Sequence, residues 1–204
     1  MPLEIVRNDI TKMQVDAIVN TANPRPIVGR GVDRAIHQAA GKELLTARKK
    51  IGELATGMAA ITPAFNLQAK FVIHTVGPVW KDGKHDERGL LSNCYSNSLQ
   101  LAADNGCTSI AFPLISAGVY GCPVEIAIAA ATQAIREFLH DHEMEVYLGD
   151  EAPVAKAISL PSKKKRSLED LLAEVDDTFS EALLSLIDVK GKTDPEVYKK
   201  ANSL

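Results

Sequence analysis

The sequence predicts an α/β fold, because a short apolar strand is followed twice by a glycine-containing loop and then by a helix. In the first unit, residues 17–19 form an apolar run that is typical of a buried strand. Residues 24–31 include two prolines and two glycines, and residues 32–40 space their apolar side chains as a helix does. Asn20 and Asn23 therefore stand where the predicted strand ends and the loop begins.

The second unit has the same order. Residues 109–112 indicate a strand, residues 113–123 form a loop that contains Gly118 and Gly121, and an alanine-rich helix is predicted over 125–142. Glycine lets a backbone approach an anion closely, and a helix N-terminus offers free N–H groups. Two such loops facing each other across strand ends predict a cleft that suits a diphosphate. Neither the G-x-G-x-x-G nor the P-loop pattern is present, so a purely structural turn is the alternative for the first loop.

Further strands are predicted from alternating or continuous apolar residues. Residues 3–7 alternate apolar and charged side chains, whereas residues 70–76 are almost continuously apolar, as in a strand buried on both faces. Two more strands are predicted over residues 58–62 and 143–148. His74 lies within an apolar run, so we expect a core histidine with a satisfied hydrogen bond, and catalysis is the alternative.

Helical spacing predicts two further helices, over residues 42–51 and 90–102, with Gly52 and Gly106 at their C-terminal ends. Asp9 follows the first strand in a segment that turns the chain. An aspartate at this place is typical of a turn or a helix cap, and a ligand contact is the alternative.

Length and composition predict one globular domain with an appendage. The chain has 204 residues, of which 46% are hydrophobic and 24% charged, and its net charge of −3 argues against general affinity for nucleic acid or membranes. Cys94, Cys107 and Cys122 form no C-x-x-C pair, so we expect reduced thiols and no zinc site. No basic-then-apolar leader or long apolar run is present, which favours a soluble cytoplasmic protein.

The last quarter of the chain is predicted to be separate from this domain. Residues 151–166 are expected to form a linker, and their basic run at 163–166 fits a solvated segment better than a nuclear-localisation or nucleic-acid signal. Residues 167–204 are predicted to be a helical extension, because Ser167 begins a capping box and leucines then recur at helical spacing. The apolar face of these helices must pack on its own domain or on a protein partner.

Motifs in both loops and in their flanking strands resemble those of the macrodomain family. The matching segments are residues 9–11, 15–23, 31–33, 35–37, 40–41, 73–78 and 113–121. The resemblance, most similar to the MacroD type, implies a three-layer α/β/α sandwich with a mixed central sheet over residues 1–150. It also implies that ADP-ribose binds in a cleft over the strand ends. The extension resembles the start of a helical module attached to some bacterial macrodomains, and DNA binding is not expected.

The resemblance places ligand contacts in three segments. Asp9 would accept a hydrogen bond from the adenine amino group with Ile10 alongside it, and Ala22 and Asn23 would line the distal ribose. The two glycine-containing loops would wrap the diphosphate. Their predicted ligand residues are Gly29, Arg30, Gly31, Val32, Ser116, Ala117, Gly118, Val119 and Tyr120. The ring of Tyr120 is placed to cover a base or a ribose, and simple loop packing is the alternative.

Asn23 and Asp33 have the spacing of the asparagine and aspartate that serve catalysis in the macrodomain hydrolases that this chain resembles. Asn23 would hold a ribose hydroxyl, and Asp33 would orient or deprotonate water. The expected reaction is hydrolysis of ADP-ribose esters, on Asp or Glu of mono-ADP-ribosylated proteins or in O-acetyl-ADP-ribose. Val28 and Arg30 replace glycines of the hydrolase pattern, so a non-catalytic ADP-ribose reader is the alternative.

No cofactor or metal is expected. The sequence lacks the additional Cys and His loop residues that characterise zinc-dependent macrodomains. The expected partner is ADP-ribose or an ADP-ribosylated protein.

Overall fold

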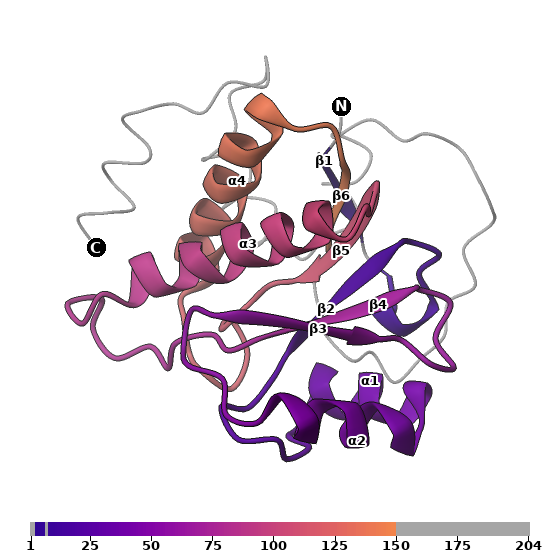
Figure 1. The fold of residues 1–204 in the computed structure, drawn as a ribbon. Coiled ribbons are helices and arrows are strands. Elements are labelled where there is room, and N and C mark those ends of the chain that lie inside the picture. The colour runs from indigo at the N-terminus through magenta and orange to yellow at the C-terminus, as the bar shows by residue number, and fades with distance from the viewer. Residues whose placement is uncertain (1–2, 7, 150–204) are drawn as a thin grey trace.

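The computed structural model describes residues 3–6 and 8–149, which form a β-sheet covered by helices on both faces (Figure 1). Within this part of the chain, six strands form one sheet in the order β1-β6-β5-β2-β4-β3. The strands are β1 (Leu3–Val6), β2 (Ala17–Thr21), β3 (Ala59–Pro63), β4 (Phe71–Thr75), β5 (Ser109–Pro113) and β6 (Glu145–Gly149). Each predicted strand is present, and its ends lie within two residues of those expected.

The sheet is mixed, as the family resemblance implied. Strands β1, β6, β5, β2 and β4 run parallel to one another, and the edge strand β3 is antiparallel to β4. Thr21 pairs with Thr75 at the end of β2 and β4, and Pro113 pairs with Gly149 at the end of β5 and β6. The carboxyl ends of the parallel strands therefore meet at one edge of the sheet.

Two helices cover each face of the sheet (Figure 1). The helices α1 (Val32–Ala40) and α2 (Lys42–Ile51) lie on one face, and α3 (Glu87–Asp104) and α4 (Val124–Asp141) lie on the other. Their apolar side chains enter two separate buried clusters, one on each side of the sheet. This arrangement confirms the predicted three-layer α/β/α sandwich.

Neighbouring residues of β2 and β4 alternate between these two clusters. Ile18 pairs with Val72 and packs with α1 and α2, whereas Val19 pairs with Ile73 and packs with α3 and α4. Full burial of such a side chain stabilises the fold by about 1.5–3 kcal/mol relative to exposure. Burial on both faces explains why the sequence of these strands is continuously apolar.

Two elements differ from the sequence prediction. The helix α3 begins at Glu87, earlier than residue 90, because the Glu87 carboxylate accepts hydrogen bonds from the backbone N–H of His85 at 2.6 Å and of Lys81 at 3.2 Å. A short 3-10 helix, η1 (Ile10–Lys12), forms in the segment expected to be a turn. Asp9 caps η1 through Oδ1, which accepts from the Thr11 N–H at 3.0 Å, so the predicted cap is confirmed.

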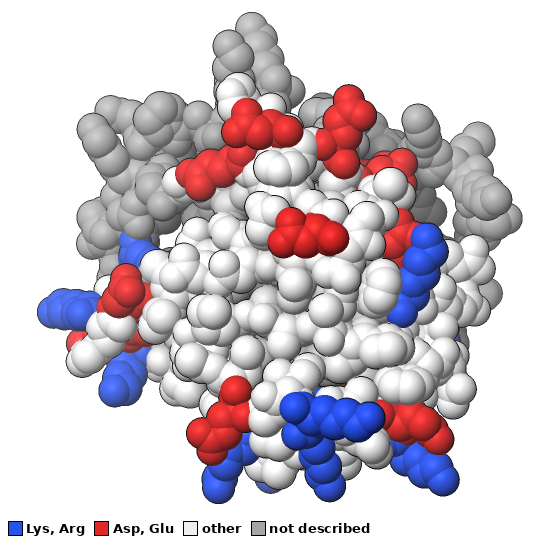
Figure 2. Space-filling model, viewed as in Figure 1, with Lys and Arg blue, Asp and Glu red and all other residues white. Residues whose placement is uncertain are grey.

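Charged side chains on the face shown in Figure 2 lie mostly toward its margins. The helix α3 crosses this face in Figure 1, and its sequence has no charged residue between Arg88 and Asp104. Among the described residues, the central part of this face has no concentration of Lys and Arg of the kind that attracts nucleic acid or a membrane surface.

The predicted linker over 151–166 and helical extension over 167–204 lie outside the described residues. None of the helices in the described part of the chain combines the length and apolar character needed to cross a membrane.

Candidate functional site

The predicted ligand-binding loops meet at the carboxyl edge of the sheet. After β2, residues 22–31 lead to α1 on one face, and after β5, residues 114–123 lead to α4 on the opposite face. The strands β2 and β5 are neighbours in the sheet. The chain thus leaves two adjacent strands in opposite directions, which makes this edge a topological switch point, where ligands of open α/β sheets bind.

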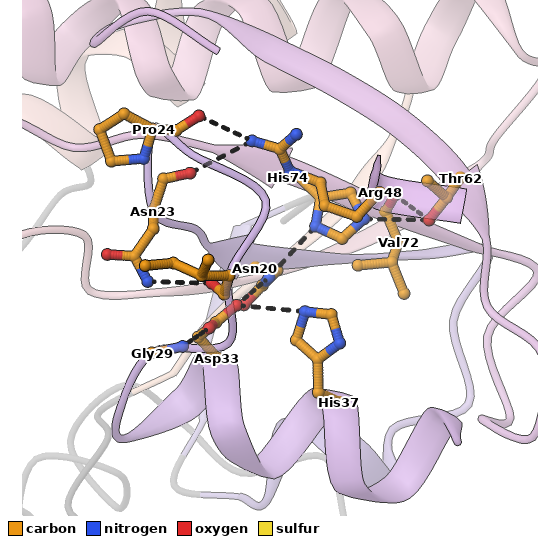
Figure 3. A network of polar contacts seen from close by, with 11 residues as sticks. Asn20, Asn23, Pro24, Gly29, Asp33, His37, Arg48, Thr62, Val72 and His74 are labelled. Atoms are coloured by element: carbon orange, nitrogen blue, oxygen red, sulfur yellow. Dashed lines mark hydrogen bonds and ion pairs between the residues drawn. The ribbon is translucent and has the colours of Figure 1, made fainter. Parts of the chain in front are cut away.

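Gly29 lies between the side chains of Asn23 and Asp33, the predicted catalytic pair. A Cβ atom at Gly29 would lie 2.6 Å from Asn23 Nδ2 and 3.1 Å from Asp33 Oδ2, so only glycine fits without a shift of its neighbours. The Gly29 N–H donates a hydrogen bond to Asp33 Oδ2, and Asn23 Nδ2 donates to the carbonyl oxygen of Ile27 at 3.2 Å. The loop thereby brings Asn23 and Asp33 together around one backbone position (Figure 3).

Asp33 is buried and is held by a hydrogen bond from the central strand β2. Its residue is 2% exposed, and Oδ1 accepts a hydrogen bond of 2.7 Å from Nδ2 of Asn20 in β2. Nε2 of His37, one turn along α1, lies 3.5 Å from the same oxygen. Both carboxylate oxygens therefore face donors of the protein, which fixes the orientation of the Asp33 side chain.

The contacts of Asn20 also settle the protonation of His74. Because Asn20 Nδ2 donates to the Asp33 carboxylate, the same amide nitrogen faces His74 Nδ1 at 3.2 Å, and Nδ1 must be the acceptor. The ring proton then lies on Nε2, which is 3.0 Å from Oγ1 of Thr62. Burial, together with the nearby positive charge of Arg48 and the ring of His37, lowers the pKa of His74 to about 3. His74 is thus the core histidine that the sequence predicted, in its neutral form.

His37 is also kept neutral at pH 7. Burial and the charge of Arg48 lower the pKa of His37 below its ordinary value, although the Asp33 carboxylate acts in the opposite direction. Its Nδ1 atom is buried and has no hydrogen-bond partner among the described residues. The carboxylate of Asp33 therefore faces two neutral polar side chains, Asn20 and His37.

The second predicted loop is anchored at Ser116. This residue is buried and has a φ of +66°, a left-handed conformation that is uncommon for a residue with a Cβ atom. A Cβ at Gly77, in the segment after β4, would lie 2.3 Å from Ser116 Oγ and 2.7 Å from Ile115 Cγ2. The two segments therefore pack tightly against each other, and Gly77 permits the contact.

The rest of that loop is open to solvent. Val119 is 86% exposed and Gly118 is also exposed, whereas Ala117 and Tyr120 are half-buried. The carbonyl oxygen of Tyr120 accepts a hydrogen bond of 2.8 Å from the N–H of Trp80. This bond joins the loop to the segment after β4, so the backbone of Tyr120 is held while the half-buried ring stays at the surface.

The start of α1 presents backbone donors at the same edge. Gly31, with a φ of +58°, precedes the helix, and no side chain caps the N–H groups of its first turn. Arg30 is exposed and Val32 is half-buried beside it. An anion is favoured at such a helix N-terminus.

Two replacements of family glycines, Val28 and Arg30, point outward. Val28 is 40% exposed and Arg30 is exposed, whereas Gly29 between them faces Asn23 and Asp33. Glycine is therefore retained at position 29, where a Cβ atom would meet Asn23 and Asp33.

Three further predicted ligand residues lie near these loops: Asp9, Ile10 and Ala22. The 3-10 helix η1 contacts both α1 and β5, which places the buried Ile10 beside the switch point. Partial burial alone would raise the pKa of Asp9, but hydrogen bonds from Thr11 and the ion pair with Lys12 at 3.2 Å hold it below its ordinary value. Ala22 is buried, and its N–H donates to the carbonyl oxygen of Thr75 at 2.9 Å.

The described residues contain one group whose side chains lie close enough to share a cation. It consists of Asp82, His85 and Glu87, with ligand atoms within 4.8 Å of one another. The Glu87 carboxylate already accepts hydrogen bonds from backbone N–H groups of the preceding loop, so this group stabilises the segment before α3.

Sequence reasoning assigned no role to Arg48, Asn20 or His37. A signal for Arg48 was present, because it lies four residues after the buried Leu44 and so shares the inward face of α2. Asn20 directly follows the apolar residues 17–19 within β2 and is buried, and a polar side chain at such a position points to a buried partner.

The sequence of this chain is similar to those of known proteins. The sequence profile described as Macro domain matches residues 19–131. A Macro domain-containing protein of Chlorobaculum tepidum is 53% identical over 139 residues, which cover 68% of this chain and 81% of that protein. An O-acetyl-ADP-ribose deacetylase of Escherichia fergusonii is 51% identical over 146 residues, which cover 70% of this chain and 82% of that protein.

Solved structures show the same fold. An Oceanobacillus iheyensis macrodomain with ADP is 44% identical in sequence and has a TM-score of 0.71. The match covers 74% of this chain and 84% of that protein's chain. A glycine-to-valine variant of that macrodomain, solved with ADPR, has a TM-score of 0.69 at 44% identity, with 72% of this chain and 83% of its own covered. Variants with an asparagine or an aspartate changed to alanine have also been solved.

Proposed function

Because the chain belongs to the Macro domain family, we propose that it binds ADP-ribose and hydrolyses its esters, with O-acetyl-ADP-ribose as a substrate. The observation that carries this proposal is the convergence of Asn23, Gly29 and Asp33 at the switch point of the sheet. Relatives named O-acetyl-ADP-ribose deacetylase at about half identity support the same reaction. Esters on Asp or Glu side chains of mono-ADP-ribosylated proteins have the same acyl–ribose linkage and belong to the proposed substrate class.

Ligand binding would use the two loops and the start of α1. The uncapped N–H groups at the start of α1 suit the negative charge of a diphosphate. Residues 116–120 would cover it from the opposite side, with the exposed backbone around Gly118 free to approach closely. Asp9 and Ile10 would receive the adenine, and Ala22 the distal ribose. The solved complexes of the Oceanobacillus macrodomain with ADP and ADPR support a ligand of this class.

Hydrolysis would depend on Asn23 and Asp33. The Asn23 amide would bind a hydroxyl of the distal ribose and so fix the position of the ester. Each carboxylate oxygen can accept more than one hydrogen bond, so Asp33 Oδ2 can hold Gly29 and also orient a water molecule. That water adds to the ester carbonyl, one of its protons passes to the ribose oxygen as the acyl–oxygen bond breaks, and the products are a carboxylic acid and ADP-ribose. No metal takes part in the proposed step.

The substituted alanine positions in the Oceanobacillus variants are ten residues apart, which is the spacing of Asn23 and Asp33 here. Its glycine-to-valine position lies three residues before that aspartate, where this chain has Arg30. Since that variant was solved with ADPR, a side chain at this place is compatible with ligand binding. We therefore propose that Arg30 leaves ADP-ribose binding intact.

A non-catalytic reader of ADP-ribose is the second candidate. It is favoured by Val28 and Arg30, whose exposed side chains stand beside Gly29 and would meet the acyl group or the attached protein. A reader would bind ADP-ribose saturably and leave the ester intact.

The test is incubation of the full chain with O-acetyl-ADP-ribose at neutral pH in the presence of EDTA. Proton NMR follows the appearance of free acetate, and calorimetry measures ADP-ribose binding to the same preparation. Acetate released at an unchanged rate with EDTA supports the metal-independent hydrolase. Binding without acetate supports the reader, and loss of release with EDTA contradicts the metal-independent step.

A further inference from the structure

Arg48 is a buried arginine that contacts residues 22–31, which we call the active-site loop. It lies on α2, is 2% exposed, and stands outside the predicted ligand-binding segments. Its Nη2 donates to the carbonyl oxygens of Asn23 and Pro24, each at 3.2 Å (Figure 3). Its Nη1 donates to the carbonyl oxygen of Gly52, just after α2. One guanidinium group therefore joins the end of a helix to two residues near the start of the loop, Asn23 and Pro24.

These contacts act on the backbone of a residue that we place in the reaction. The carbonyl group of Asn23 belongs to the same residue whose side chain turns toward Ile27 and Gly29. Pro24 O also accepts from the N–H of Leu54 at 2.9 Å, so Arg48 and Leu54 together hold the start of the loop. The end of the loop is held by Asp33 through Gly29.

The charge of Arg48 has no close anion. Among the described residues no carboxylate forms an ion pair with it, and Asp33 acts on it only through space. Burying an arginine costs free energy unless its donors are used. Nη1 and Nη2 of Arg48 donate three bonds to loop or helix-end carbonyls, whereas its buried Nε has no partner among the described residues. A planar group with several donors can hold carbonyls on two segments at once, whereas a lysine ammonium is a single point.

We propose that Arg48 is a positioning residue for the hydrolysis reaction, which fixes Asn23 through its main-chain carbonyl. The inference rests on the proposed function, because it assigns Arg48 a part in that reaction. Without the guanidinium bridge, the Asn23 carbonyl loses the bond from Arg48 and the Pro24 carbonyl keeps only the bond from Leu54, so the Asn23 amide loses its fixed distance from Gly29 and Asp33. The backbone donors that we assign to the diphosphate lie at the start of α1 and in residues 116–120, whereas Arg48 contacts Asn23 and Pro24, so Arg48 affects turnover more than affinity.

The test compares Arg48→Met and Arg48→Lys with Leu44→Ala in the full chain. Leu44 lies one turn earlier on the same helix and is fully buried in the apolar cluster, so its truncation lowers stability without touching the loop. We expect both Arg48 variants to lower kcat on O-acetyl-ADP-ribose by about tenfold or more, since misplacement by about 1 Å is that costly. KM and the ADP-ribose Kd stay within about threefold of wild type. Leu44→Ala keeps kcat at a temperature where it remains folded.

Hydrogen–deuterium exchange of residues 22–31 supplies a readout that needs no activity. Faster exchange of this loop in both Arg48 variants, with wild-type exchange in Leu44→Ala, is the expected result. Unchanged loop exchange overturns the proposal, as does wild-type kcat in Arg48→Met. Full recovery of kcat by Arg48→Lys overturns the bridging role, because charge alone would then suffice. If wild-type protein releases no acetate, the proposed hydrolysis fails, and loop exchange alone decides whether Arg48 fixes Asn23.

Discussion

Nδ2 of Asn20 lies 2.7 Å from Oδ1 of Asp33, and this buried hydrogen bond connects the centre of the sheet to the active-site loop. Asn20 is the second-to-last residue of β2, and Asp33 lies in the first turn of α1. The same amide reaches His74 on β4, so three segments share one donor group. The aspartate that we place in catalysis is thus oriented by the core of the fold.

Replacing Asn20 with alanine removes the shared donor. Asp33 Oδ1 and His74 Nδ1 then lose a buried partner, and we expect the free energy of unfolding to fall by about 2–4 kcal/mol, because each orphaned group costs about 1–3 kcal/mol. Urea denaturation measures the change. The exposed Asn93 on α3 is a matched control, and Asn93→Ala should change stability by less than about 0.5 kcal/mol. Equal stability of wild type and Asn20→Ala would show that this bond does not hold Asp33.

His74 makes the fold sensitive to acid. Its pKa is lowered to about 3 by burial, whereas an unfolded histidine titrates near 6.5, so the unfolded state takes up the proton first. The contribution of His74 to stability is complete above about pH 6.5 and is lost as the pH falls toward 3, by up to about 1.4 kcal/mol per pH unit.

His74→Gln keeps an acceptor and a donor but does not titrate, so its stability should fall less steeply between pH 6 and pH 4. Urea midpoints at several pH values measure this slope. The same substitution at the exposed His140 of α4 serves as the control for a histidine outside the core. A slope in His74→Gln as steep as that of wild type would contradict the buried neutral histidine.

Gly29→Ala tests the contact between the predicted catalytic residues. The added Cβ would meet Asn23 Nδ2 at 2.6 Å and Asp33 Oδ2 at 3.1 Å, so at least one side chain must move. We expect kcat to fall by about a hundredfold, because reacting groups must be held to a fraction of an ångström. ADP-ribose affinity and Tm should change little, since the contact is local. A variant with wild-type kcat would place catalysis elsewhere in the cleft.

Gly77 and Ser116 form a pair whose substitutions should not be additive. A Cβ at Gly77 would lie 2.3 Å from Ser116 Oγ, so Gly77→Ala should lower the free energy of unfolding by about 1–3 kcal/mol, as overpacking does.

Ser116→Gly removes that oxygen and also suits the positive φ, so the double variant should be more stable than Gly77→Ala alone. Thermal unfolding of both single variants and the double variant measures the coupling. Strict additivity would show that the two residues do not touch.

The strands and most helices could be predicted from local pattern. Apolar runs gave β2, β4 and β5, and helical spacing with terminal glycines gave α1 and α2. The early start of α3 could not be predicted, because it depends on a carboxylate, that of Glu87, folding back onto its own loop.

The candidate site was predictable in part. Spacing and family resemblance predicted Asn23 and Asp33, and the structure places them on either side of Gly29. The support beneath them was not predicted, since Asn20, His74 and Arg48 come from three elements that meet only in the folded chain. A sequence shows that a polar residue lies on a buried face, but its partner depends on tertiary packing.

The central claim is that Asp33 serves turnover rather than ligand affinity. The most direct test measures, on one preparation each of wild type and Asp33→Ala, the rate of acetate release from O-acetyl-ADP-ribose and the Kd for ADP-ribose. We predict that release falls by about a hundredfold or more while Kd changes by less than about threefold. Equal losses of rate and affinity, or wild-type protein that binds ADP-ribose and releases no acetate, would contradict the account.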